Sequence, residues 1–284
     1  MLRLAVAIAD HRAAPSAFVV WRGFADSMRK AADAGYHGVE LALRTADEID
    51  ADALRALLDA HGLQVSCIST GQVYAALGLA FTHPDAAVRS KVVDVFRGLI
   101  ELAGTFGGMI NVGRVRGQIA EGHSPADAEH LFVETTRRIC DDAAAHGVTI
   151  VLEPVNRYEI NFINTLADGA ALCARVARPN LGLMPDVFHM NIEDARIGAS
   201  LQRHAALIKY IHLADSNRRA PGQGHLDFDD VFAALEAMRY RGWAAVEILP
   251  QPDPDTAARQ AAAYLLPRVV KYNAAIAANT RADA

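Results

Sequence analysis

Short apolar runs alternate with longer amphipathic stretches along this sequence, and this alternation restricts the fold more than any other feature. The runs have the length of strands, whereas the stretches between them repeat their apolar residues with the period of a helix. The apolar runs are residues 4–8, 38–41, 65–69, 109–112, 149–153, 181–186, 208–214 and 244–248. The helical patterns are residues 23–34, 51–61, 86–106, 125–146, 165–176, 192–204, 228–238 and 255–274.

Eight strand–helix units in 284 residues average about 35 residues each, which is the length that a βα unit needs. An open, doubly wound sheet also alternates strands and helices, but it usually ends at about five or six strands. No linker rich in glycine, serine or proline divides the chain. We therefore expect an α/β fold, a single (β/α)8 TIM barrel over residues 1–279, followed by a polar C-terminal tail at residues 280–284.

Composition and charge argue against several classes of partner. Apolar residues make up 52% of the chain, enough for a large core, and the net charge of -5 gives no sign of a nucleic acid or an anionic membrane as partner. No apolar run reaches the roughly 18 residues of a membrane helix, and the first residues lack the basic lead-in and cleavage site of a secretory signal. The three cysteines, Cys67, Cys140 and Cys173, are far apart and form no CxxC pair. They predict reduced thiols in a soluble cytoplasmic protein.

Each of the last four apolar runs places a side chain that can bind a metal ion at or near its end. These side chains are Glu153, Asp186, His212 and Glu247. Any one of them alone could be a solvated loop acid, a turn cap or a hydrogen-bonded core histidine. In a parallel barrel, however, the strand ends meet at one face, where three carboxylates would repel one another without a cation. Together they predict a site for one divalent metal, Mn²⁺ in the first place, with Mg²⁺ or Co²⁺ also suited to the oxygen-rich set.

The segments around these residues resemble a known family. They are residues 153–159 (EPVNRYE), residues 186–191 (DVFHMN), and residues 212–218 (HLADSNR) continuing to residues 221–225 (PGQGH). Here, and over nearly the whole chain, the sequence resembles the xylose isomerase-like barrels, specifically the ketose 3-epimerase branch related to D-tagatose 3-epimerase. Within that branch, three shorter segments are most similar to the 5-keto-L-gluconate epimerases. These are residues 69–72 (STGQ), 82–84 (THP) and 115–117 (VRG).

The resemblance implies a role for each matching residue. It makes the four strand-end residues the metal ligands, with Glu153 and Glu247 also acting as the acid/base pair. His189 and Arg218 match residues that hold oxygens near the substrate carbonyl, where donors can stabilise a developing oxyanion. Glu159 matches a further substrate contact. Without the resemblance, Arg218 and Glu159 could be ordinary surface charges. Relatives assemble as dimers or tetramers, so a homo-oligomer is expected.

The resemblance also implies an isomerase, namely a carbohydrate epimerase, that acts on a small-molecule ketose or keto-sugar acid. The expected reaction inverts the carbon beside the carbonyl through a metal-bound cis-enediolate, and inversion needs carboxylate acid/bases on both faces of the substrate. An aldose–ketose or hydroxypyruvate-type isomerase with the same metal site is the alternative, because transfer on one face needs only one base. An endonuclease for abasic DNA would need further metal ligands and a basic groove, and a non-catalytic sugar-binding barrel would not need the acid/base pair.

Two arginines that follow residues 109–112 bear on the class of substrate. Arg114 and Arg116 stand where the tagatose-epimerase relatives tend to carry aromatic or apolar residues. An arginine at the rim of a pocket can hold a carboxylate through two hydrogen bonds, and we predict this role for Arg116. A solvated basic loop is the alternative, so the choice between a neutral and an acidic substrate stays open.

Three further residues are candidates for shaping the substrate pocket. Gln72 and Cys67 lie near the end of the third apolar run, and we predict that they form part of the pocket wall. Glu40 lies near the end of the second run, where it could contact the substrate or pair with Arg44.

Overall fold

The computed structural model describes residues 1–15 and 17–282. Its strands follow the predicted apolar runs closely. They are β1 (Arg3–Ala9), β2 (Trp21–Arg22), β3 (Gly38–Ala42), β4 (Gln64–Ser69), β5 (Met109–Val112), β6 (Thr149–Leu152), β7 (Leu181–Leu183), β8 (Tyr210–Leu213) and β9 (Trp243–Val246). The two-residue strand β2 pairs with β1, outside the main ring.

The other eight strands of the described chain close into a barrel. Hydrogen-bonded neighbours follow the order β7-β6-β5-β4-β3-β1-β9-β8, and all pairs are parallel. The two ends of this order meet through parallel bridges from Leu183 to Ile208 and from Asp186 to His212. The predicted TIM barrel is therefore confirmed, and one of the closing bridges joins two of the predicted metal ligands.

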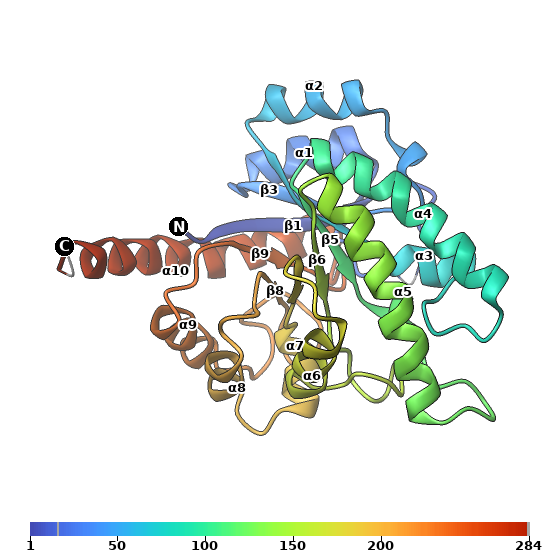
Figure 1. Ribbon diagram of the computed structural model, residues 1–284. Helices are drawn as coiled ribbons and strands as arrows, with labels where there is room; N and C mark the ends of the chain where they lie inside the picture. Colours follow the sequence, from blue (N-terminus) through green and yellow to red (C-terminus); the bar gives the residue numbers. More distant parts are fainter. Residues whose placement is uncertain (16, 283–284) are drawn as a thin grey trace.

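Helices cover the outside of the barrel (Figure 1). They are α1 (Phe24–Asp33), α2 (Ala51–His61), α3 (Gly71–Leu77), α4 (Ala86–Thr105), α5 (Pro125–Ala145), α6 (Leu166–Val176), α7 (Val187–Glu193), α8 (Ile197–Arg203), α9 (Phe228–Ala237) and α10 (Pro254–Ala282), with the one-turn helices η1 (Ala46–Glu48) and η2 (Arg114–Arg116). Local signals set their boundaries. Asp50 caps the start of α2 by accepting the N–H of Ala53 at 2.8 Å, and Gly62 ends it with a left-handed φ of 64°.

Three stretches differ from the predicted elements. The helix predicted over residues 192–204 corresponds mainly to α8, whereas α7 begins earlier, at Val187, and the backbone between the two helices is extended at Asp194 and Arg196. Helix α3 follows β4 where no helix was predicted. Helix α10 continues through Ala282 into the predicted polar tail, and residues 283–284 of that tail lie outside the described residues.

An apolar cluster fills part of the barrel interior and supports the polar residues near it. Its members are Ala5, Cys67, Val151, Met184, Tyr210, Trp243 and Ala245. The ring of Tyr210 packs edge-on against the imidazole of His212, with centroids 5.7 Å apart. Cys67, Cys140 and Cys173 are all buried free thiols. Within residues 1–15 and 17–282, no helix is both long and apolar enough to cross a membrane.

Candidate metal and substrate site

Four acidic and imidazole side chains converge at the carboxyl ends of the last four barrel strands. Glu153 and Glu247 directly follow β6 and β9, Asp186 lies just beyond β7, and His212 belongs to β8. One ligand atom from each of the four lies within 4.8 Å of the others. The structure thus brings together all four residues that the strand ends predicted.

The imidazole of His212 is oriented by contacts on both of its ring nitrogens. Nδ1 lies 3.4 Å from Glu153 Oε1, 3.5 Å from Glu247 Oε2 and 4.0 Å from Asp186 Oδ2. Nε2 lies 2.9 Å from Oε2 of Glu40, which is fully buried in β3. If Nε2 donates its hydrogen to Glu40, the lone pair of Nδ1 is directed at the three carboxylates, as a metal ligand requires.

Glu40 therefore has neither of the roles that its position in the sequence suggested. It is not among the residues that line the cavity, and Arg44 instead forms an ion pair with Glu48. Its partner is a candidate metal ligand. No local sequence motif connects Glu40 with His212, which lies 172 residues away.

The donor set fits a divalent cation. Three carboxylates and one imidazole supply the hard oxygen and borderline nitrogen ligands that such ions prefer. In this structure the guanidinium of Arg218 forms ion pairs with Asp186 and Glu247, so it offsets part of the negative charge. The burial of these acidic groups favours a cation between them, because closely spaced carboxylates cannot all remain ionised without positive charge nearby.

The two glutamates of the cluster have pKa values shifted in opposite directions. Burial raises the pKa of Glu247, and the negative charge of Glu153 adds to this effect, so the net shift is upward. Burial also acts to raise the pKa of Glu153, but the hydrogen bond to His212 and the charges of His212 and His189 outweigh it, and the net shift is downward. A pair of carboxyl groups with unequal proton affinity is suited to acid/base chemistry.

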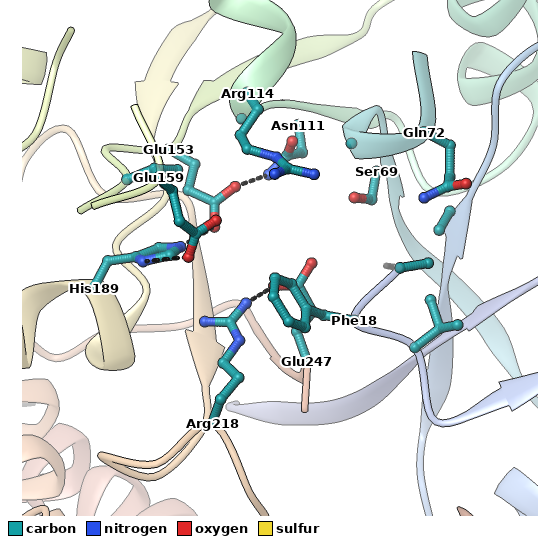
Figure 2. A pocket seen from close by; sticks show the side chains of 16 residues that line it. Phe18, Ser69, Gln72, Asn111, Arg114, Glu153, Glu159, His189, Arg218 and Glu247 are labelled. Carbon is teal, nitrogen blue, oxygen red and sulfur yellow. Dashed lines mark hydrogen bonds and ion pairs between the residues drawn. The ribbon is translucent and has the colours of Figure 1, made fainter. Parts of the chain in front are cut away.

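A cavity of about 530 Å³, including the part open to solvent, lies over this cluster. The predicted site residues that line it are Gln72, Glu153, Glu159, His189, Arg218 and Glu247. Figure 2 shows these side chains reaching into the cavity from several sides. Asp186 and His212 complete the group of candidate metal ligands but are not among the lining residues.

His189 is held as a hydrogen-bond donor toward the metal cluster. Its Nδ1 lies 2.8 Å from the amide nitrogen of Asn156, and the oxygen of that amide accepts the N–H of Tyr158 at 3.0 Å, which fixes the amide orientation. Burial lowers the pKa of His189, so the ring is neutral at neutral pH and carries its hydrogen on Nε2. This atom lies 3.7 Å from Asp186 and 3.9 Å from Glu153. Asn156 lies within the EPVNRYE segment but is not among the predicted site residues.

Arg218 is presented by a loop with a precise internal structure. Its backbone has a left-handed φ of 60°, unusual for a residue with a side chain. Asp215 holds the loop by accepting the N–H groups of Ser216 and Gly222 at 2.7 Å and that of Leu226 at 3.1 Å. The Nε of Arg218 is buried without a partner among the described residues. Arg218 is also one of the residues that line the cavity.

Aromatic rings enclose the same guanidinium. Its central carbon lies 4.6 Å from the ring centroid of Phe18 and 4.8 Å from that of Phe188, distances typical of cation–π contacts. Phe18 also lines the cavity. Neither ring was predicted as a site residue, because isolated aromatic residues are more often part of the core.

Arg116 does not lie at the rim, contrary to the prediction. It is fully buried, and its guanidinium donates to carbonyl oxygens of Phe162 and Ile163 at 2.9 Å, Gly113 at 2.9 Å and Glu153 at 3.1 Å. Burial lowers its pKa to about 10, so it keeps its charge at neutral pH. Through these hydrogen bonds Arg116 links the segment that follows β5 to the segment that follows β6. The arginine that lines the cavity is Arg114.

Cys67 also lies elsewhere than predicted. It is fully buried in the apolar cluster inside the barrel and is not a lining residue of the cavity. Cys67 and Ser69 are two positions apart and therefore share one face of β4, but Ser69, at the carboxyl end of the strand, is the one that lines the cavity.

Two residues that sequence patterns did not single out fix the carboxylate of Glu153. Asn111 donates its amide N–H to Oε2 of Glu153 at 2.8 Å. A Cβ atom at Gly113 would lie 2.6 Å from that same oxygen and 3.2 Å from the side-chain oxygen of Asn111. Only glycine leaves room for the carboxylate in this position.

Comparisons with known sequences agree with this geometry. Residues 28–268 match a family described as the xylose isomerase-like TIM barrel. An L-ribulose 3-epimerase of Methylomonas sp. is 34% identical over 236 residues, which cover 79% of this chain and 80% of that protein. A 2-oxo-tetronate isomerase of Cupriavidus necator is 31% identical over 236 residues, which cover 80% of this chain and 88% of that protein.

A comparison of folds agrees as well. The crystal structure of a D-allulose 3-epimerase from Methylomonas sp., in complex with D-allulose, has a TM-score of 0.79 at 28% sequence identity, and the match covers 94% of this chain and 97% of that one. The family match spans most of the chain, and the relatives are sugar isomerases and epimerases. This chain therefore belongs to the xylose isomerase-like TIM barrel family, in its ketose 3-epimerase branch, and is an isomerase that acts on carbohydrates.

Proposed function

We propose that this protein inverts the carbon beside the carbonyl of a ketose or keto-sugar acid. The observation that carries the proposal is the pair of glutamates that line one cavity, Glu153, which is buried, and Glu247, which is partly buried. They follow β6 and β9, which are separated in the ring by β7 and β8, and they approach the cavity from different directions (Figure 2). Inversion requires a base on one face of the substrate and an acid on the other.

The proposed resident cofactor is one divalent cation, Mn²⁺ in the first place, with Mg²⁺ or Co²⁺ as alternatives, held by Glu153, Asp186, His212 and Glu247. When bound, it would stabilise the negative charge that develops on substrate oxygens as the proton leaves. The protein's own residues bind, orient and protonate the substrate. Because an epimerisation is reversible, Glu153 and Glu247 exchange the roles of base and acid between the two directions.

Three other cavity residues have proposed roles in holding the substrate. The Nε2–H of His189 and the guanidinium of Arg218 are donors for oxygens at and beside the carbonyl. Glu159, held at 3.1 Å by the amide of Asn156, is an acceptor for a substrate hydroxyl. The similarity to an L-ribulose 3-epimerase and to a D-allulose 3-epimerase supports a keto-sugar as the substrate.

The alternative function is isomerisation, in which the carbonyl moves to the adjacent carbon. The similarity to a 2-oxo-tetronate isomerase favours it, and the same metal ligands would serve. Transfer between adjacent carbons on one face needs a single base, so one glutamate would be dispensable for proton transfer.

Incubation of the Mn²⁺-loaded protein with ketoses in D₂O tests both functions. D-Tagatose, D-fructose, D-allulose and L-ribulose are suitable neutral substrates, and NMR locates the incorporated deuterium. We expect the C3 epimer with deuterium on the inverted carbon. An aldose product with deuterium on the former carbonyl carbon would establish the alternative, and no exchange with any keto-sugar or keto-sugar acid under Mn²⁺, Mg²⁺ or Co²⁺ would overturn the proposal.

A further inference from the structure

One cationic side chain of the cavity is left without an anionic partner. Arg114 and Arg218 both line the cavity, but Arg218 is neutralised by Asp186 and Glu247. Across residues 1–15 and 17–282, no carboxylate forms an ion pair with Arg114. Its guanidinium lies over the ring of Tyr74, whose centroid is 5.7 Å from the guanidinium carbon.

The wall around Arg114 also offers hydrogen-bond donors. Gln72 uses its side-chain oxygen to accept the N–H of Ala14 at 2.9 Å, which leaves its NH₂ group for the cavity. The hydroxyl of Ser69 faces the same space. Figure 2 shows Ser69 and Gln72 on the side of the cavity away from His189, with Arg114 between Glu153 and Ser69. Both Ser69 and Gln72 are buried, so the wall is part of the built cavity.

The opposite side of the cavity carries acidic side chains. Glu159 lies there, 3.9 Å from Nδ1 of His189, and Glu153 and Glu247 belong to the metal cluster. An anionic group of a substrate would be repelled at that side and attracted at the wall that carries Arg114. The charges of the cavity therefore favour one orientation of a substrate. Its reacting carbons would lie at Glu153 and Glu247, and its anionic end would lie at Arg114.

We infer that the site prefers keto-sugar acids, and that Arg114 binds the carboxylate at the substrate end remote from the reacting carbon. This inference rests on the proposed function and narrows its substrate class. A guanidinium binds a carboxylate through two parallel hydrogen bonds, and the Gln72 amide and Ser69 hydroxyl can donate to the same group. A neutral hydroxymethyl group leaves the charge of Arg114 unpaired.

Pairs of substrates that differ only at the terminal carbon test the inference. D-Tagatose and D-tagaturonate form one pair, and D-fructose and D-fructuronate form another. We expect kcat/KM to be higher for the acid of at least one pair. Arg114→Gln should lower kcat/KM for the acid by about 10- to 100-fold, and by much less for the neutral ketose. Arg114→Lys, which keeps the charge but loses the paired donors, should lie between the two.

The matched control is Arg138→Gln, which removes a charge from an exposed position of α5. It should leave the ratio of acid to ketose activity unchanged. The KM for the acid should also rise with salt more than the KM for the ketose, because salt screens the charge of Arg114. Thermal unfolding of each variant verifies that the fold is retained.

Each outcome decides the inference. Equal losses on the acid and the ketose in Arg114→Gln overturn it, as does a stronger preference for a ketose phosphorylated at the same carbon. If no substrate exchanges hydrogen, the proposed function fails, and calorimetric binding to the Mn²⁺-loaded protein decides the inference separately. Tighter binding of D-tagaturonate than of D-tagatose, lost in Arg114→Gln, supports it, and equal binding overturns it.

Discussion

Nε2 of His212 lies 2.9 Å from Oε2 of Glu40, although the two residues are 172 positions apart in the sequence. Both side chains are fully buried. The contact occupies one ring nitrogen and leaves Nδ1 facing Glu153 and Glu247. A carboxylate that orients a metal-binding histidine in this way contributes about 10- to 100-fold to metal affinity or activity in known metal sites. Glu40 is therefore a positioning residue that acts through His212.

We expect Glu40→Gln to weaken the binding of Mn²⁺ by about 10- to 100-fold, because an amide offers His212 no charged acceptor. Calorimetric titration of the metal-free variant measures the change. Glu48→Gln is the matched control, since the side chain of Glu48 is also largely buried but pairs with Arg44. An affinity in Glu40→Gln equal to that of the wild type would show that Glu40 does not position the histidine.

Metal binding should release protons and become tighter as the pH rises. Burial acts to lower the pKa of His212, but the charges of Glu40 and Glu247 and the hydrogen bond to Glu153 outweigh it, so its pKa is raised well above the ordinary value. The metal-free protein therefore carries an extra proton on His212 at neutral pH. A cation at Nδ1 must displace that proton, and the raised pKa of Glu247 acts in the same direction.

Titration with Mn²⁺ in buffers of different ionisation enthalpy counts the protons released. We expect at least one proton per bound ion, and a higher affinity at about pH 8 than at about pH 6. The Glu40→Gln variant should release fewer protons, because the pKa of His212 falls when the charge of Glu40 is removed. An affinity that does not change with pH, without proton release, would contradict the protonated state of His212.

The convergence of the four candidate metal ligands could be predicted from the sequence because barrel closure alone determines where these side chains meet. Glu153 and Glu247 directly follow strands, and His212 lies within one. In a parallel barrel the carboxyl ends of the strands form one face. No knowledge of side-chain packing is needed to place these residues together once the strand–helix units are identified.

The contacts that support the cluster depend on packing and could not be predicted in the same way. Glu40 meets His212 across the barrel interior, and only the detailed register of the strands decides which inward side chains touch. Arg114 and Arg116, within one turn of helix, are an example of contacts that the sequence does not determine. They are two positions apart in η2, yet one lines the cavity and the other is buried among backbone carbonyls. The sequence shows that they point in different directions, but not which of them faces the cavity.

Arg116→Met is expected to destabilise the fold. The variant removes the donors to the carbonyl oxygens that Arg116 binds, and each buried polar group left unpaired costs about 1–3 kcal/mol. We expect the free energy of unfolding to fall by about 3 kcal/mol or more, as measured by urea denaturation. Arg114→Met, in the same turn, should change it by about 0.5 kcal/mol or less. An equal fall in the free energy of unfolding in the two variants would contradict the stabilising role of Arg116.

The loop that presents Arg218 depends on Asp215, so Asp215→Ala should impair the site more than the fold. Its carboxylate accepts three backbone N–H groups, and without them the left-handed backbone of Arg218 loses its support. We expect faster hydrogen exchange over residues 215–226 and a fall in kcat/KM of about 100-fold, the effect of a misplaced binding group.

Asp50→Ala is the matched control for Asp215→Ala, because it removes a helix cap from α2 at a cost of about 1 kcal/mol without reaching the cavity. Both variants should therefore unfold at lower denaturant concentration than the wild type, while only Asp215→Ala should lose turnover. Unchanged exchange in the loop together with full activity would show that Arg218 is held by its ion pairs to Asp186 and Glu247 alone. A loss of activity that matches that of Asp50→Ala would reduce the role of Asp215 to general stability.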